Sequence, residues 1–157
     1  MTVKSSTPRV AVVGAGMAGV VAARKLAGSG LDVVVFENSR GIGGRLATRR
    51  TRDGYRFDHG AQFIKGRGQE FRQLLDEALS AGSAERWQAK IAGDLSMNEP
   101  WFVGTPGMNG LLKPLAEDLD IRFETEVRGV AEQDGGFLLE DAAGESLGVF
   151  DRLICTA

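Results

Sequence analysis

The first third of the chain alternates short apolar runs with a helix-like pattern. Residues 9–13 (RVAVV) form a β-branched apolar run, typical of a strand buried on both faces of a parallel sheet. Helical spacing follows from Met17 to Ala27, with residues 28–30 (GSG) to close it and one apolar face made of Val20, Ala23, Leu26 and Ala27. Residues 32–37 (DVVVFE) repeat the buried-strand pattern. The sequence therefore predicts a βαβ unit with a parallel sheet.

The remaining pattern predicts three kinds of element. A hairpin is expected over residues 46–65, with its turn at 52–54. Helical spacing predicts helices over 68–82 and 107–120, the second with its first turn near Leu112 or Lys113 because Pro114 favours a helix start. A β-meander is expected to begin at 121–127 (IRFETEV), with turns at 134–136 and 143–144, and residues 152–157 (RLICTA) predict a last buried strand.

Composition narrows the class of protein. The 157 residues, 43% apolar and 25% charged, are typical of a globular chain. A net charge of −2 gives no general attraction to nucleic acid or an anionic membrane, so a small molecule is the expected partner. The single Cys155 and single His59 exclude an internal disulfide and favour no metal site. A cytoplasmic location is the default; the apolar start imitates a signal peptide, but its glycines suit a strand, turn and helix.

Three glycines carry the first chemical signal. Gly14, Gly16 and Gly19 form G-x-G-x-x-G between the first strand and the first helix, and Glu37 ends the next strand. Gly14 permits a tight turn, Gly16 lets backbone N–H groups approach a pyrophosphate, and Gly19 allows close helix packing. Glu37 can accept hydrogen bonds from both ribose hydroxyls and would repel a 2′-phosphate. The pattern predicts a dinucleotide site and disfavours NADP.

A second glycine motif follows. Gly43, Gly44 and Arg45 place more bare backbone and a guanidinium near the same phosphates. With this G-G-R, the chain resembles the FAD-binding family of flavin amine oxidases, phytoene desaturases and renalase. Residues 101–116 (WFVGTPGMNGLLKPLA) resemble bacterial renalase-like proteins in particular. The resemblance covers residues 9–157 and implies FAD as the cofactor.

The resemblance also implies which residues bind the cofactor. In the family, the segment after the G-G-R hairpin lies beside the flavin ring, the strand matching ETEVRGV contacts adenine through a valine backbone, here Val127, and the strand matching DRLICTA ends near the cofactor at Thr156. The expected cofactor-binding set is Gly14, Ala15, Gly16, Met17, Ala18, Gly19, Glu37, Asn38, Gly43, Gly44, Arg45, Gly60, Ala61, Gln62, Val127 and Thr156.

The expected fold is an α/β, Rossmann-like FAD/NAD(P)-binding domain with a parallel sheet, a β-meander and the start of a substrate lobe. The FAD-binding parts are expected at 1–65 and 105–157, and the partial substrate lobe at 66–104. Family members are about twice this length, so the chain is expected to be an N-terminal portion that self-associates through an exposed edge.

Two functions stay open. The first is an FAD-dependent oxidoreductase that transfers hydride from an amine or dihydronicotinamide to FAD, with oxygen as the final acceptor and peroxide as product. The alternative is a truncated, non-catalytic FAD-binding module. No catalytic residue is assigned.

Several residues allow a structural or a functional interpretation. Asp58 either caps backbone N–H groups or contacts the cofactor, and His59 is solvated or structural rather than a general base. The arginines 49, 50, 52 and 56 favour a solvated hairpin face over an anionic-substrate patch. Cys155 is expected to be an inert core thiol, and Trp87 and Trp101 to be packing residues rather than substrate contacts.

Overall fold

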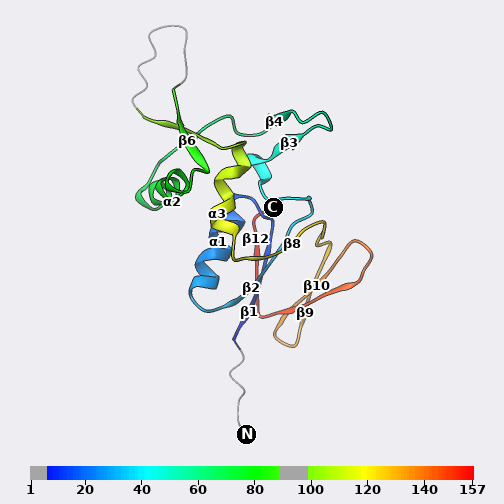
Figure 1. Cartoon of the computed structure of the whole chain (residues 1–157). Coiled ribbons are helices and arrows are strands. Elements are labelled where there is room, and N and C mark those ends of the chain that lie inside the picture. The colour runs from blue at the N-terminus through cyan, green and yellow to red at the C-terminus, as the bar shows by residue number, and fades with distance from the viewer. Residues whose placement is uncertain (1–6, 89–98) are drawn as a thin grey trace. The chain divides into compact units, whose positions relative to one another are not determined.

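The computed structural model describes residues 7–88 and 99–157 (Figure 1). Its contacts divide the chain into two compact units: unit 1 contains residues 1–44 and 116–157, and unit 2 contains residues 45–115. Residues 89–98, part of the predicted substrate lobe, lie outside the described residues. The functional division at 1–65, 66–104 and 105–157 stays a prediction, and each unit is described by itself below.

Unit 1 is built on the predicted βαβ unit. It comprises β1 (Arg9–Val13), α1 (Met17–Gly28) and β2 (Asp32–Phe36). The two strands are parallel, with Ala11 opposite Val34, and the central residues of both are buried. α1 buries Val20 and Ala23 as expected, but Ala27 is exposed because it lies in the last turn, beside the exposed Gly28.

Two further strands complete a parallel sheet of order β12-β1-β2-β8. β8 (Asp120–Arg122) pairs with β2. Residues 121–127 therefore do not begin the β-meander, which corrects the sequence prediction. The first two of them, Ile121 and Arg122, belong to β8 and pair with the edge of β2, where Glu37 N–H also donates to the Arg122 carbonyl oxygen at 2.9 Å.

The other edge strand, β12 (Arg152–Cys155), is less buried than predicted. It pairs with β1 alone within this sheet. Leu153 and Ile154 are half-buried, whereas Cys155 is exposed. The expectation of a core thiol at Cys155 is thus wrong, because an edge strand leaves one side of its residues uncovered.

The β-meander consists of β9 (Gly129–Gln133), β10 (Gly136–Glu140) and β11 (Ser146–Phe150), all antiparallel. Its predicted turns are present, with positive φ at Asp134, Gly135 and Gly144. The meander contributes Leu139 and Phe150 to a core cluster with Ala11, Val34 and Phe36. The rings of Phe36 and Phe150 meet edge to face at 5.7 Å between centroids.

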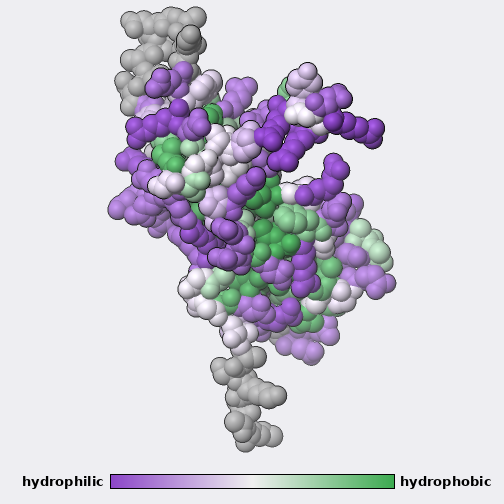
Figure 2. Space-filling model, viewed as in Figure 1, coloured by the Kyte–Doolittle hydropathy of each residue, from purple (hydrophilic) through white to green (hydrophobic). Residues whose placement is uncertain are grey.

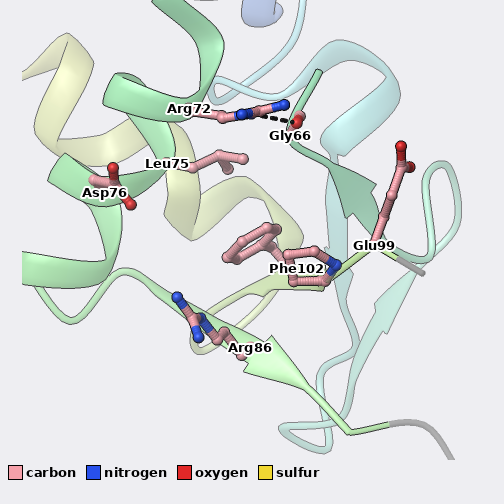
Figure 3. Close-up of a pocket in the computed structure, with 8 residues that line it drawn as sticks. Gly66, Arg72, Leu75, Asp76, Arg86, Glu99 and Phe102 are labelled. Carbon is pink, nitrogen blue, oxygen red and sulfur yellow. Dashed lines mark hydrogen bonds between the residues drawn. The ribbon is translucent and has the colours of Figure 1, made fainter. Parts of the chain in front are cut away.

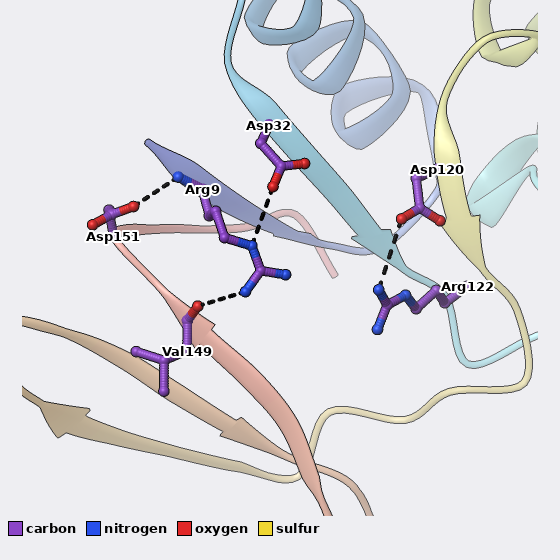
Figure 4. Close-up of polar contacts among 6 residues, drawn as sticks. All are labelled: Arg9, Asp32, Asp120, Arg122, Val149 and Asp151. Atoms are coloured by element: carbon purple, nitrogen blue, oxygen red, sulfur yellow. Dashed lines mark hydrogen bonds and ion pairs between the residues drawn. The ribbon is translucent and has the colours of Figure 1, made fainter. Parts of the chain in front are cut away.

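Arg9 ties three strands of unit 1 together (Figure 4). Its N–H donates to Asp151 Oδ2 at 2.7 Å, its Nε donates to Asp32 Oδ2 at 3.2 Å, and Nη1 donates to the Val149 carbonyl oxygen at 3.1 Å. The guanidinium also lies 4.7 Å from the Phe150 ring centroid. One side chain therefore links β1 with β2 and with the end of the meander.

Unit 2 begins with a hairpin that is shorter than predicted. β3 (Thr48–Arg50) and β4 (Arg56–Asp58) pair antiparallel, and the turn contains Gly54 with φ +85°. The predicted second half does not extend to residue 65, since β5 (Ile64–Lys65) pairs with β7 instead. A 3-10 helix, η1 (Gly44–Leu46), occupies the start of the predicted hairpin.

The rest of unit 2 joins a helix with a small sheet. α2 (Gln69–Ser80) buries Leu75 and Ala78, as its helical spacing predicts. The antiparallel sheet has the order β5-β7-β6, where β6 is Ala84–Trp87 and β7 is Trp101–Gly104. Phe102 is buried. Its paired residues in the neighbouring strands, Ile64 and Arg86, lie on the same face of the sheet.

The second predicted helix is split and shortened. Residues Met108–Leu112 form a 3-10 helix, η2, and α3 covers Lys113–Ala116, so the start beside Pro114 is confirmed. The expected continuation to residue 120 is wrong: Leu119 N–H bonds the Ala116 carbonyl oxygen at 3.2 Å, a turn that leads into β8. No helix among the described residues is long and apolar enough to span a bilayer.

Candidate functional site

The loop after β1 has the geometry that its glycines predict. Gly14 has φ +100°, and a Cβ at this position would lie 2.9 Å from the Thr156 Oγ1. Its N–H donates to the Phe36 carbonyl oxygen at 2.8 Å, which ties the loop to the end of β2. A side chain at residue 14 would thus be both strained and blocked.

Gly19 lets α1 approach the loop closely. A Cβ on Gly19 would collide with the Gly14 carbonyl oxygen and would also crowd Thr156. The first turn of α1 can therefore lie directly against the loop only if residue 19 has no side chain.

The N-terminus of α1 is open to an anion. Its N-cap residue is Gly16, which offers no capping side chain, and the first turn contains no acidic residue. Ala18 is exposed, whereas Ala15 is fully buried. Free N–H groups and the helix dipole favour a negative group at such an end.

The second glycine motif packs on the first. Gly43 N–H donates to the Ala15 carbonyl oxygen at 3.0 Å, and Gly16 and Gly43 form a parallel bridge. Gly44 has φ +53°, and a Cβ there would lie 3.2 Å from the Gly16 Cα. The second motif is thus a backbone partner of the first, a role that the glycine spacing alone does not predict.

Glu37 joins the same two loops through its side chain. Its Oε2 accepts the Ala15 N–H at 2.7 Å, and its Oε1 accepts the N–H and the Oγ of Ser39 at 2.8 and 2.5 Å. Partial burial alone would raise the pKa of Glu37, but these hydrogen bonds outweigh it and hold the pKa below the ordinary value of 4.5. The carboxylate is therefore charged and oriented by the protein.

Ser39 was not among the residues expected at the site, whereas its neighbour Asn38 was. Asn38 is exposed, and the contacts of this loop run through Ser39. A serine two residues after a carboxylate is a sequence signal for a local side-chain to backbone hydrogen bond, and it could have been read as such.

Thr156 lies at the end of β12, against the glycine loop. Its N–H and its Oγ1 both lie 2.9 Å from the Val13 carbonyl oxygen, and Oγ1 is 3.2 Å from that of Gly14. Val127 packs half-buried against the core cluster of unit 1. The roles predicted for the two residues toward a cofactor stay predictions.

In unit 2, backbone contacts join Arg45 to two other residues of the expected cofactor-binding set, Gly60 and Ala61. Ala61 N–H donates to the Arg45 carbonyl oxygen at 2.8 Å, and a Cβ on Gly60 would collide with that same oxygen. The Arg45 side chain and Gln62 are exposed. The structure thus brings Arg45, Gly60 and Ala61 to one point of unit 2.

Asp58 makes contacts of the kind that its capping interpretation predicts. Its Oδ1 accepts the Met108 N–H at 2.9 Å and the Thr48 Oγ1 at 2.5 Å, so it caps the start of η2. His59 is exposed. The arginines of the hairpin are exposed too, and Figure 2 shows hydrophilic residues over much of the hairpin, although Tyr55 and Phe57 are also exposed there.

Three aromatic side chains pack on one side of the small sheet in unit 2. Phe63 stacks on Trp101 with 4.0 Å between ring centroids, and Trp87 lies 5.6 Å from Trp101. The two tryptophans pack against each other as expected, although Trp87 is 39% exposed.

A hollow of about 340 Å³ lies on the opposite side of this sheet, against α2 (Figure 3). Its floor is Leu75 and Phe102, and charged side chains surround it; the lining is Gly66, Arg72, Leu75, Asp76, Arg86, Glu99, Pro100 and Phe102. None of the expected cofactor-binding residues lines it. Within residues 7–88 and 99–157, no group of three or more His, Cys, Asp or Glu is arranged to hold a metal ion.

Known proteins resemble the N-terminal part of the chain. Residues 12–78 match the family model described as an NAD(P)-binding Rossmann-like domain. An L-amino-acid oxidase of Crotalus adamanteus is 51% identical over 55 residues, 35% of this chain and 11% of the relative. A phytoene desaturase of Neurospora crassa is 42% identical over 62 residues, 39% of this chain and 10% of the relative.

A 4,4′-diapophytoene desaturase of Staphylococcus aureus is 38% identical over 56 residues, 36% of this chain and 11% of the relative. The chain thus spans about a tenth of the length of these curated relatives. The fold prediction is confirmed: the chain contains a Rossmann-like domain with a parallel sheet. Its similarity to oxidoreductases rests on a short N-terminal stretch.

Proposed function

We propose that unit 1 binds the ADP portion of FAD without a covalent bond. The observation that carries this proposal is the hydrogen bond from Gly43 to Ala15, which joins both glycine motifs at the N-terminus of α1. A pyrophosphate would be bound by the free N–H groups of that helix end, and Glu37 would accept a ribose hydroxyl. The second glycine motif supports FAD over NAD, in line with the family resemblance.

The activity that fits this cofactor is oxidation of an amine or a dihydronicotinamide. FAD would supply the hydride acceptor, and oxygen would regenerate it with release of peroxide. The chain's own residues in unit 1 would bind and orient the cofactor. The similarity to an L-amino-acid oxidase and to desaturases supports an oxidoreductase, and the renalase-like assignment rests on residues 101–116.

Thermal shift with FAD and with NADP tests the cofactor. Saturation at about 100 times the dissociation constant adds roughly 2.7 kcal/mol of apparent stability, so FAD is expected to raise the melting temperature. NADP is expected to leave it unchanged because Glu37 would repel the 2′-phosphate. Equal shifts with both ligands would contradict the assignment.

Peroxide release with amines and with dihydronicotinamides tests the activity. Production above the background of free FAD would support the oxidase. Tight FAD binding with no turnover would favour the alternative, a non-catalytic FAD-binding module, and would leave the cofactor proposal intact.

A further inference from the structure

We propose that Ser39 is a positioning residue for the Glu37 carboxylate, holding it in one orientation for the adenosine ribose of FAD. This proposal rests on the proposed FAD site in unit 1. It assigns Ser39 no contact with the cofactor.

The first step is the number of acceptor positions that Glu37 has left. A carboxylate offers about four, two on each oxygen. Ser39 uses two on Oε1 through its N–H and its hydroxyl, and Ala15 uses one on Oε2. One position on Oε2 stays available for a ligand hydroxyl while Ser39 is in place.

The second step concerns the single hydroxyl proton of Ser39. Its Oγ lies 2.5 Å from Glu37 Oε1 and 2.9 Å from the Gly41 carbonyl oxygen, so two acceptors compete for one proton. A charged acceptor forms the stronger hydrogen bond, so the proton goes to Glu37.

The third step is that backbone hydrogen bonds fix Ser39 itself. Glu124 N–H donates to the Ser39 carbonyl oxygen at 3.1 Å, and Thr125 N–H donates to that of Glu37 at 3.0 Å. The segment after β8 thereby holds the loop after β2 in place through two backbone hydrogen bonds. Ser39 is thus a fixed donor, and the carboxylate that it orients loses little freedom when a ligand binds.

Fluorescence titration of the 157-residue chain with FAD tests this role. We expect Ser39→Ala to weaken FAD binding roughly threefold to tenfold, the usual size of a coupling between contacting groups. Ser39→Thr keeps the hydroxyl and is expected to bind as the native chain does. Ser29→Ala is the control, because the Ser29 Oγ donates to the Lys25 carbonyl oxygen at the far end of α1.

A double-mutant cycle separates positioning from a general structural effect. In a Glu37→Gln background, Ser39→Ala is expected to cause no further loss, because its target is already altered. A full additional loss, or native affinity in Ser39→Ala alone, would overturn the proposal. Failure of Ser39→Thr to restore binding would overturn it as well.

A measurement without ligand keeps this test distinct from that of the FAD site. The carboxyl carbon resonance of Glu37 should titrate at a higher pH in Ser39→Ala than in the native chain, because two donors to Oε1 become one. Identical titrations would overturn the role of Ser39. Absence of FAD binding by the native chain, with the titration shifted as expected, would count against the FAD site only.

Discussion

The Gly43 amide donates to the Ala15 carbonyl oxygen at 3.0 Å, and this bond makes the two glycine motifs one structure. Residues 28 positions apart in the sequence thereby share a backbone contact at the N-terminus of α1. The first motif then constrains the second, since a Cβ at residue 44 would lie 3.2 Å from Gly16 Cα, whereas a Cβ at residue 16 would make only ordinary contacts with the second motif.

The contact predicts a selective effect of Gly44→Ala. Residue 44 has φ +53°, and its Cβ would lie 3.2 Å from Gly16 Cα, so the substitution should cost about 1 to 3 kcal/mol of stability. FAD affinity should fall with it. Gly41→Ala is the control in the same loop, since nothing lies within 4 Å of its Cβ position. Equal melting temperatures for the two variants would contradict the packing argument.

Gly19→Ala is expected to displace α1 from the loop. The new methyl group would collide with the Gly14 carbonyl oxygen, and overpacking of this kind usually costs about 1 to 3 kcal/mol. Gly28→Ala, in the last turn of the same helix with open space around it, should be neutral or slightly stabilising. Urea unfolding of both variants provides the comparison.

Glu37 predicts a pH dependence of stability. The hydrogen bonds hold the pKa of the folded state below 4.5, so the charged carboxylate stabilises the fold at and above that pH. This contribution is lost as the pH falls through the lowered pKa. Melting temperatures of the native chain and Glu37→Gln should therefore differ most near neutral pH and converge on acidification. A difference that grows toward low pH would show that the sign is wrong.

Thr156→Val should loosen the glycine loop from β12. The variant keeps the shape of the side chain but loses the hydroxyl contacts to the Val13 and Gly14 carbonyl oxygens, a loss of about 1 kcal/mol. Thr156→Ser keeps the hydroxyl and serves as the control. Hydrogen exchange of the Gly14 amide is the local probe: faster exchange is expected in the valine variant alone.

Asp58→Ala separates the capping role of Asp58 from a cofactor role. Met108 is 1% exposed, so loss of the acceptor for its N–H should cost about 1 to 3 kcal/mol. Asp58→Asn retains an acceptor and should lose less. FAD affinity per folded molecule is expected to stay native in both, and a specific loss of affinity in Asp58→Asn would favour a cofactor contact.

The βαβ unit could be predicted from the sequence because local signals agree there. Apolar runs, helical spacing and glycines at fixed offsets all favour the same local structure. The roles of Gly14 and Gly19 follow from the same signals. β8 was not predicted because it is only three residues long and is a strand only through its pairing with β2, a long-range contact.

Other errors of the sequence prediction also come from contacts between distant parts of the chain. The exposure of Cys155 depends on β12 being an edge strand, and β5 leaves the predicted hairpin because it pairs with β7. Ser39 was not predicted at the site, although a serine two residues after a carboxylate is a local signal, because its two acceptors are placed beside it only in the folded loop.

The pairing of β1 with β12 also orders events during protein synthesis. The glycine loop is translated early, but its Val13 carbonyl oxygen bonds Thr156, 143 residues later. Non-local pairings of this kind form slowly, and the glycine loop lacks its contacts with β12 until that strand has left the ribosome. A nascent chain therefore carries both glycine motifs long before it carries the strand whose last residues pack against them.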